Sequence, residues 1–210
     1  AGANRAGTGA GNFAIPVARD GTMRGATGTD DNGSISAIGP LIYAGDANAW
    51  MQIRIKTDLV TGLSLEFGFV AAVPGSNAAA CSDVDTPTVA DDTAVFTIDT
   101  DQTIATMAFA TGGTAFTDVA TTLAAVPGFT SGTTPVLDTF YTARIELVGN
   151  AAYGYINGRR VASHTGHAVE GGTLVAPWIY CRTRNTTTHL CSVDYIAVGQ
   201  NRNLVAAENY

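Results

Sequence analysis

The segment from Glu146 to Thr165 carries the residue types best suited to binding, with tyrosines, a glutamate and two adjacent arginines around an Asn-Gly pair. Arg159 and Arg160 beside that pair could in principle clamp an anion. However, Asn157 and Gly158 stand between two apolar runs and predict a type I′ turn, whose central residues both need positive φ. Successive residues of a strand point to opposite faces, so we expect a hairpin corner and no anion clamp.

The same hairpin predicts which side chains share a face. Tight turns at Gly149 and Asn150 and at Asn157 and Gly158 would place apolar residues on a core face that includes Val161. The opposite face would carry Arg144, Glu146, Tyr153, Tyr155, Arg160 and Ala162. This face has two interpretations. It is either an ordinary solvated or subunit-facing surface or a binding platform, since Tyr and Arg are enriched at binding hot spots.

The elements that must position these residues are short strands. Runs rich in Val, Ile, Thr, Phe and Tyr are separated by turn residues, which is typical of an all-β domain. One weak helical pattern occupies 116–128, where its threonines and closing proline allow at most a short helix. Alternation in 63–72 predicts one buried and one solvated face, with Glu66 on the solvated side. Strands are expected at 50–57, 63–72, 94–100, 103–111, 142–148, 152–156, 159–164, 177–184 and 190–199.

The chain of 210 residues is long enough for one sandwich domain. Residues 1–34 contain many glycines and few large apolar side chains, which predicts an arm or irregular lead-in. We expect the sandwich to occupy 35–200 and a C-terminal tail to occupy 201–210.

Three cysteines are too few for a disulfide framework. If 177–199 forms one hairpin with a three-residue loop, Cys181 lies directly opposite Cys191. A cross-strand disulfide and a pair of reduced, buried thiols are then both possible.

Composition and motifs disfavour several function classes. The formal net charge of −7, with a single lysine, disfavours nucleic acid as a partner, and no apolar run is long enough to span a membrane. The spacing of Cys and His predicts no zinc site, acidic pairs match turn chemistry better than calcium ligation, and no cofactor motif is present. None of the four glutamates is paired with a second carboxylate on one strand face, so we expect no enzymatic activity.

Four segments carry a family resemblance: "MQIRIKTDLVTGLSLEFGFV", "DDTAVFTIDTDQT", "YTARIELVGNAAYGYINGRRVASHT" and "PWIYCRTRNTTTHLCSVDYIAVG". Together they resemble the concanavalin A-like (LamG-like) jelly-roll domains found among virion proteins of tailed bacteriophages. The resemblance covers roughly 35–200. It implies a two-sheet antiparallel jelly-roll sandwich, but the glycosidase strand motif and lectin metal ligands of the wider fold have no counterpart.

The resemblance leads to the expectation of a non-enzymatic capsid decoration protein on the virion surface. Its partners would be the major capsid protein and further copies of the chain in a homotrimer. The alternative is a carbohydrate-binding module, of a phage tail or fibre or of a secreted protein, whose platform binds surface glycans.

Overall fold

A computed structural model describes residues 2–6, 13–14, 21–30, 32–58, 61–72, 79–83, 88–99, 104–113, 116–123, 126, 128–129, 134–166 and 169–201. The predicted tail therefore lies outside the described residues except for Asn201. The described part contains one short 3-10 helix, η1 (Gly45–Ala47), and is otherwise built from strands. In this part of the chain, no helix has the length and apolar character needed to cross a membrane.

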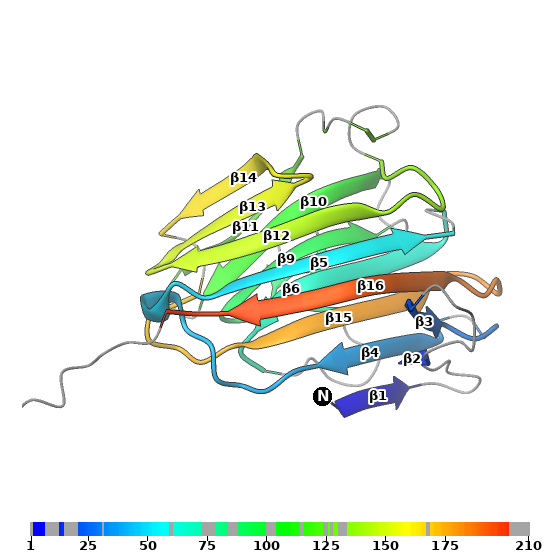
Figure 1. The fold of residues 1–210 in the computed structure, drawn as a ribbon, viewed down its shortest axis with the longest axis horizontal. Coiled ribbons are helices and arrows are strands. Elements are labelled where there is room, and N and C mark those ends of the chain that lie inside the picture. Colours follow the sequence, from blue (N-terminus) through cyan, green and yellow to red (C-terminus); the bar gives the residue numbers. More distant parts are fainter. Residues whose placement is uncertain are drawn as a thin grey trace, which may run out of the picture.

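Two seven-stranded antiparallel sheets face each other as a sandwich (Figure 1), which confirms the predicted fold class. Sheet A has the strand order β1 (Gly2–Ala6), β4 (Ser34–Ile38), β15 (Ala176–Thr183), β6 (Leu63–Val70), β9 (Thr93–Asp99), β10 (Ile104–Gly113) and β11 (Phe116–Thr122). Sheet B has the order β14 (Arg159–Thr165), β13 (Ala151–Ile156), β12 (Tyr141–Val148), β5 (Trp50–Thr57), β16 (Leu190–Gly199), β3 (Met23–Ala26) and β2 (Phe13–Ala14). A small third sheet pairs β7 (Cys81–Asp83) with β8 (Thr88–Val89).

The sequence-predicted register of β12, β13 and β14 is present, with one correction. Asn157 and Gly158 form the turn with φ values of 49° and 80°, and Tyr155 pairs with Arg160 as predicted. A β-bulge then pairs Gly154 with Ala162, where the sequence had suggested Val161. Ala162 therefore packs into the core, and its predicted place on the outer face is wrong because the bulge adds one residue to β14.

The described parts of the N-terminal region form strands at sheet edges, where an irregular arm had been expected. β1 pairs with β4 at the edge of sheet A, and β2 and β3 extend sheet B beyond part of β16. Backbone pairing with β4 and β3 places these parts of the glycine-rich region in the sheets. The described part of 1–34 thus contributes β1 to sheet A and β2 and β3 to sheet B (Figure 1).

The expected hairpin of 177–199 is wrong, because β15 and β16 belong to different sheets. β15 pairs with β4 and β6, whereas β16 pairs with β3 and β5. Arg184 to His189 thus cross from one sheet to the other. The weak helical pattern at 116–128 does not form a helix over its first part, because 116–122 form strand β11.

The core lies between the sheets, and sheet A is also covered on its outer face. Inner side chains such as Phe67, Phe96 and Ile145 are at most 2% exposed. On the outer face, Trp178 and Tyr180 are each 2% exposed and pack in a second apolar cluster with residues of β7 and β8. Strand β6 is consequently buried on both faces, and the prediction that its Glu66 face is solvated is wrong.

Candidate functional site

The five predicted platform residues lie together on the outer face of sheet B. Register places Arg144 beside Tyr155 and Glu146 beside Tyr153, with Arg160 opposite Tyr155. The alternation of β12 and β13 turns these side chains away from the core, whose residues occupy the intervening positions. We call this set of five residues the platform.

The platform side chains contact one another. Arg144 Nε donates to Glu146 Oε1 at 2.7 Å, and the Arg160 guanidinium lies 5.9 Å from the centre of the Tyr153 ring. Partial burial, followed by a hydrogen bond with Glu146, raises the pKa of Tyr155 above its ordinary value. The charges of Arg144 and Glu146 offset each other, so this part of the surface is polar without a strong net charge.

The strands next to the platform add aromatic residues that the sequence analysis had left out. Trp50 on β5 pairs with Glu146, and the Arg144 guanidinium lies 4.5 Å from the centre of the Trp50 ring. Tyr195 on β16 accepts a hydrogen bond from Gln52 Nε2 at 2.7 Å. A signal existed for β5, because alternation in 50–57 places Trp50 and Gln52 on the face opposite the buried Met51.

Trp50 lines a groove of about 350 Å³ at one end of sheet B. Two backbone hydrogen bonds hold the segments that form the groove: Leu147 N donates to Ala49 O at 2.8 Å, and Asn201 N donates to Ala47 O at 2.7 Å. This volume is at the low end of the roughly 300–1,000 Å³ typical of small-molecule sites. The cavity, called the Trp50 groove, is lined by Asn48, Trp50, Arg144, Glu146, Leu147, Val148 and Asn201.

The groove combines an aromatic ring with hydrogen-bonding groups of several kinds. Glu146 offers carboxylate oxygens that accept, Arg144 offers donors, and the carboxamides of Asn48 and Asn201 can do both. A ligand with apolar faces and many hydroxyl groups would match this set. The platform residues Tyr153, Tyr155 and Arg160 lie on the same face but are not among the residues that line the groove.

Cys181 and Cys191 are both free and buried in the core. They come from facing sheets, so the predicted cross-strand position within one hairpin is wrong, while two reduced thiols match the other alternative. Burial, together with the nearby Cys191, raises the pKa of Cys181 well above its ordinary value. Burial likewise raises that of Cys191 to about 12.

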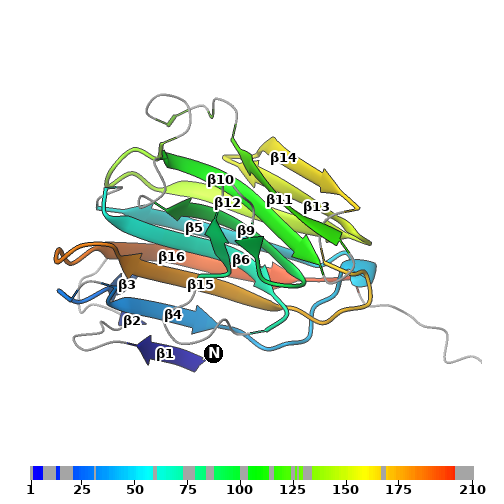
Figure 2. The ribbon, with the colours of Figure 1, turned by 180° about the vertical axis from the view of Figure 1, so that it is seen from behind.

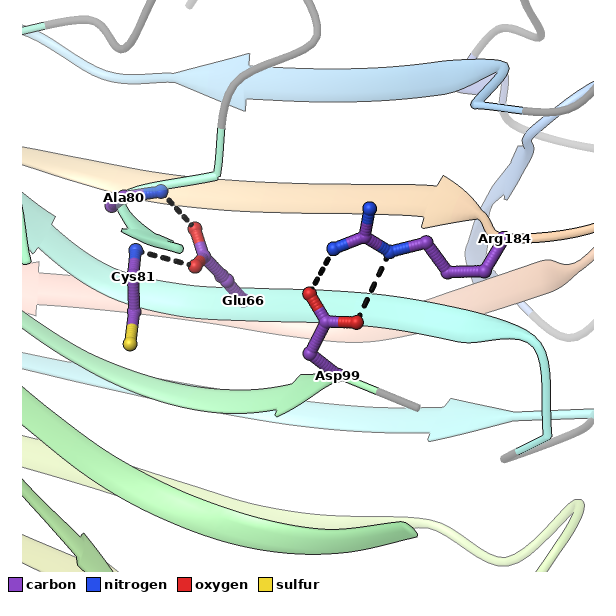
Figure 3. Close-up of polar contacts among 5 residues, drawn as sticks. All are labelled: Glu66, Ala80, Cys81, Asp99 and Arg184. Carbon is purple, nitrogen blue, oxygen red and sulfur yellow. Dashed lines mark hydrogen bonds and ion pairs between the residues drawn. The ribbon is translucent and has the colours of Figure 1, made fainter. Parts of the chain in front are cut away.

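A second group of charged residues lies on the outer face of sheet A (Figure 3). Glu66 is fully buried, and its carboxylate accepts hydrogen bonds from Ala80 N at 2.7 Å and Cys81 N at 2.8 Å. On the neighbouring strand β9, Asp99 is paired with Arg184, whose Nε donates to Asp99 Oδ1 at 3.0 Å. Burial raises the pKa of Glu66 from 4.5 to about 7, although the hydrogen bonds from Cys81 N, Ala80 N and the Trp178 indole act in the opposite direction; the charge of Asp99 adds a smaller increase.

The sequence analysis did not find Glu66 and Asp99 as a pair, because it considered two carboxylates on one strand and these two come from different strands. Glu66 pairs with Thr97, and Asp99 follows Thr97 by two residues on the same face. Within the described part of the chain, no cluster of three His, Cys, Asp or Glu residues could hold a metal ion.

No protein-family model matches the sequence, and no curated protein sequence is significantly similar to it. The fold is shared with solved structures of low sequence identity. A Bacillus licheniformis β-glucanase matches with a TM-score of 0.59 and 12% identity, over 95% of this chain and 92% of that one. An alginate lyase of polysaccharide lyase family 7 matches with a TM-score of 0.55 and 14% identity, over 90% and 83% of the two chains.

The carbohydrate recognition domain of Emp47p is similar as well, with a TM-score of 0.58 and 10% identity, over 85% of this chain and 83% of that one. A sialidase also matches, but this chain spans only 15% of it. At these identities the likeness shows the fold, a jelly-roll sandwich used by glycan-binding and glycan-active proteins.

The comparisons contradict the prediction that the chain is not an enzyme. A β-glucanase and an alginate lyase, both enzymes, share its fold. That prediction considered only carboxylate pairs within one strand, whereas Glu66 and Asp99 bring two carboxylates to one sheet face from neighbouring strands.

Proposed function

We propose that this chain binds carbohydrate and that the Trp50 groove receives a sugar residue. The observation that carries the proposal is the composition of the groove, where an indole ring stands beside a carboxylate, a guanidinium and two carboxamides. A pyranose ring has an apolar face of C–H groups that can lie on the indole, and hydroxyl groups that both donate and accept hydrogen bonds. The fold, which glycan-binding and glycan-active domains also use, supports this reading.

The electrostatics favour a neutral sugar. The charge of Arg144 is offset by Glu146, and that of Arg54 on the same face is offset by Asp194. An anionic sugar would compete with Glu146 for Arg144, and it would approach a chain of formal net charge −7. A neutral glycan can use the free acceptor and donor positions of the pair without separating it.

A glycan array followed by calorimetric titration of the best glycan tests the proposal. Trp50→Ala removes the ring and should weaken binding at least about tenfold, as expected for an aromatic hot spot. Tyr195→Ala is the matched control, because it removes an aromatic side chain from the same sheet face outside the groove. Absence of any bound glycan, or equal losses in both variants, would contradict the proposal.

The wider platform is proposed to extend the same surface along β13 and β14. Tyr153 and Tyr155 would contact further sugar units of an oligosaccharide after the first unit occupies the groove. Tyr155→Ala should then weaken a longer glycan more than a monosaccharide. Equal effects on both ligands would confine the site to the groove.

The role of a phage capsid decoration protein on the virion, in contact with the major capsid protein and as a homotrimer, stays a prediction. It is supported by the sequence resemblance of 35–200. Mass spectrometry of purified virions is the measurement for it, and absence of this chain from them would argue against it.

A further inference from the structure

The second half of strand β16 has a neighbouring strand on one side only. β3 pairs with 190–193 of β16, whereas β5 continues along β16 as far as Gly199. The register with β5 shifts just after Val193, which makes Asp194 the extra residue of a bulge. Bulges commonly end strand pairing, and β3 ends at this point. Among the described strands, none pairs with 195–199 on the side away from β5 (Figure 1).

The incomplete edge exposes a side chain of the inner face. Ile196 pairs with Ile53, whose side chain is 1% exposed in the core, so Ile196 also points toward sheet A. Ile196 itself is 40% exposed. An inner-face isoleucine with this exposure marks a place where the sandwich lacks a covering strand.

A cavity of about 210 Å³ lies beside Ile196, between the two sheets. Met51 and Ile196 of sheet B line it together with Ala37, Pro177 and Ile179 of sheet A, and the other lining residues are also apolar. A cavity of about 150 Å³ can hold one benzene molecule, so this one has room for one or two aliphatic side chains. We call the edge of 195–199 together with this cavity the edge slot.

Described residues close both ends of the edge slot. Met23, the first residue of β3, pairs with Val193 at one end. At the other end, Gln200 accepts a hydrogen bond from Ala44 N at 3.1 Å and donates one through Nε2 to Ile42 O at 3.0 Å. The stretch between these ends spans about 17 Å at about 3.4 Å per residue, which is the length of a short strand.

The main chain of this edge is suited to pairing. An edge strand directs alternate N–H and C=O groups away from its sheet, and proteins commonly guard such an edge with lysine, proline or inward-pointing charges. The residues at 195–199 are instead Tyr, Ile, Ala, Val and Gly. The edge therefore combines hydrogen-bonding groups of the backbone with an apolar cavity on one face.

Sheet A forms the floor of the edge slot and continues beyond it. Figure 2 shows β4 and then β1 extending sheet A past β15. If β16 of a second copy paired antiparallel with 195–199, β4 and β1 of the two copies would lie in the same layer and overlap. The space thus suits a single extended segment better than the edge of a second sandwich.

We propose that the edge slot binds an extended peptide segment of a partner protein, which adds a strand to sheet B beside β16. The main chain of the peptide would pair with 195–199, and every second side chain, of about the size of valine, would enter the cavity. β3 shows that this edge accepts a strand, because it occupies the preceding positions of the same edge. The inference is independent of the Trp50 groove, which lies on the outer face.

Titration of the intact chain with a synthetic strand peptide tests the proposal. The probe is an acetylated and amidated heptapeptide of alternating threonine and valine, and amide hydrogen exchange is followed by nuclear magnetic resonance. Saturable binding should raise the protection of alternate amides within 195–199 at least about tenfold, whereas the amides directed to β5 should change little. Failure to bind at millimolar peptide, or binding that leaves the exchange of 195–199 unchanged, would overturn the proposal.

A second peptide separates strand addition from simple filling of the cavity. In it, the backbone nitrogens that would face β16 are methylated, so the side chains stay the same while main-chain hydrogen bonds are lost. This peptide should bind at least about tenfold more weakly. Equal affinity of the two peptides would make the cavity a site for apolar ligands in general and would refute strand pairing.

Two alanine-to-leucine variants locate the bound peptide. Ala37→Leu fills part of the cavity and should weaken binding of the unmethylated peptide at least about tenfold. Ala197→Leu is the matched control, because Ala197 pairs with Gln52 on the outer face of the same edge strand, and it should change the affinity by less than about twofold. Similar losses in both variants would refute binding in the edge slot, and the two peptides test the proposal even where Ala37→Leu fails to fold.

Discussion

Replacing Glu66 with glutamine should change how the stability of the whole domain depends on pH. The Glu66 pKa is about 7 in the folded chain and 4.5 for the ordinary carboxyl group, a difference of about 2.5 units. At about 1.4 kcal/mol per unit, this corresponds to about 3–4 kcal/mol of unfolding free energy. The folded state favours the protonated carboxyl group, so this contribution is fully present below pH 4.5 and is lost as pH rises through 7.

The expected result is a difference between two stability curves. Relative to Glu66→Gln, the wild-type chain should lose about 3–4 kcal/mol of unfolding free energy from about pH 4.5 to about pH 8, as measured by urea denaturation. Glutamine keeps one oxygen that can accept from Ala80 N or Cys81 N, but it loses the other hydrogen bond. Because glutamine does not ionise, this loss lowers the stability of the variant by the same amount at every pH.

Glu146→Gln is the matched control, because this glutamate is ion-paired on the surface with a side chain 31% exposed. Its removal should cost at most about 1 kcal/mol. A wild-type curve parallel to that of Glu66→Gln, or one that rises with pH relative to it, would refute the conclusion that burial controls Glu66.

Three further predictions concern the packing of the sandwich. Gly68→Ala should destabilise the chain by about 1–3 kcal/mol in urea denaturation, since its Cβ would stand 2.2 Å from Ala94 O; an unchanged midpoint would contradict this close approach. Asp99→Asn should cost about 3 kcal/mol or more, because it removes the carboxylate charge from an ion pair whose Arg184 side chain is only 12% exposed; a loss below 1 kcal/mol would indicate that the pair is solvated. A thiol reagent should modify the protein only after unfolding, because the three thiols, of Cys81, Cys181 and Cys191, are buried and form no disulfide; rapid modification of the native chain would contradict their burial.

The strands of the platform could be predicted because local signals agree there. The Asn157 and Gly158 turn fixes the register of β13 and β14, and alternation then assigns each face. The bulge after Arg160 could not be predicted, since Val161 and Ala162 are both acceptable in a core. Only packing against the facing sheet selects Ala162 for the interior.

The separation of β15 from β16 could not be predicted for a different reason. A short polar link between two strands is compatible with a hairpin and with a crossing between sheets. The choice depends on which strands flank each one, and β4, β6, β3 and β5 lie far away in the sequence. The prediction that Cys181 lies opposite Cys191 in one hairpin was therefore wrong as well, because it depended on pairing β15 with β16.

The burial of Glu66 depends on contacts that no local pattern contains. Alternation in β6 separates Glu66 from Phe67 correctly, but it does not show that β7 and β8 pack on the outer face of sheet A. The hydrogen bonds that Glu66 accepts from Ala80 N and Cys81 N join residues 14 and 15 positions apart through tertiary structure. The outward position of Trp50, by contrast, could be predicted from alternation, and Trp50 is the aromatic residue that lines the groove.

The most direct measurement of the proposed function is a nuclear magnetic resonance titration of the two indole N–H signals with the best glycan from the array. The chain has two tryptophans, of which Trp50 lines the groove on sheet B and Trp178 lies buried on the outer face of sheet A. We predict that the Trp50 signal shifts in a saturable way while the Trp178 signal stays in place. A shift of Trp178 with Trp50 unmoved, or no shift of either signal at saturating glycan, would contradict binding in the Trp50 groove.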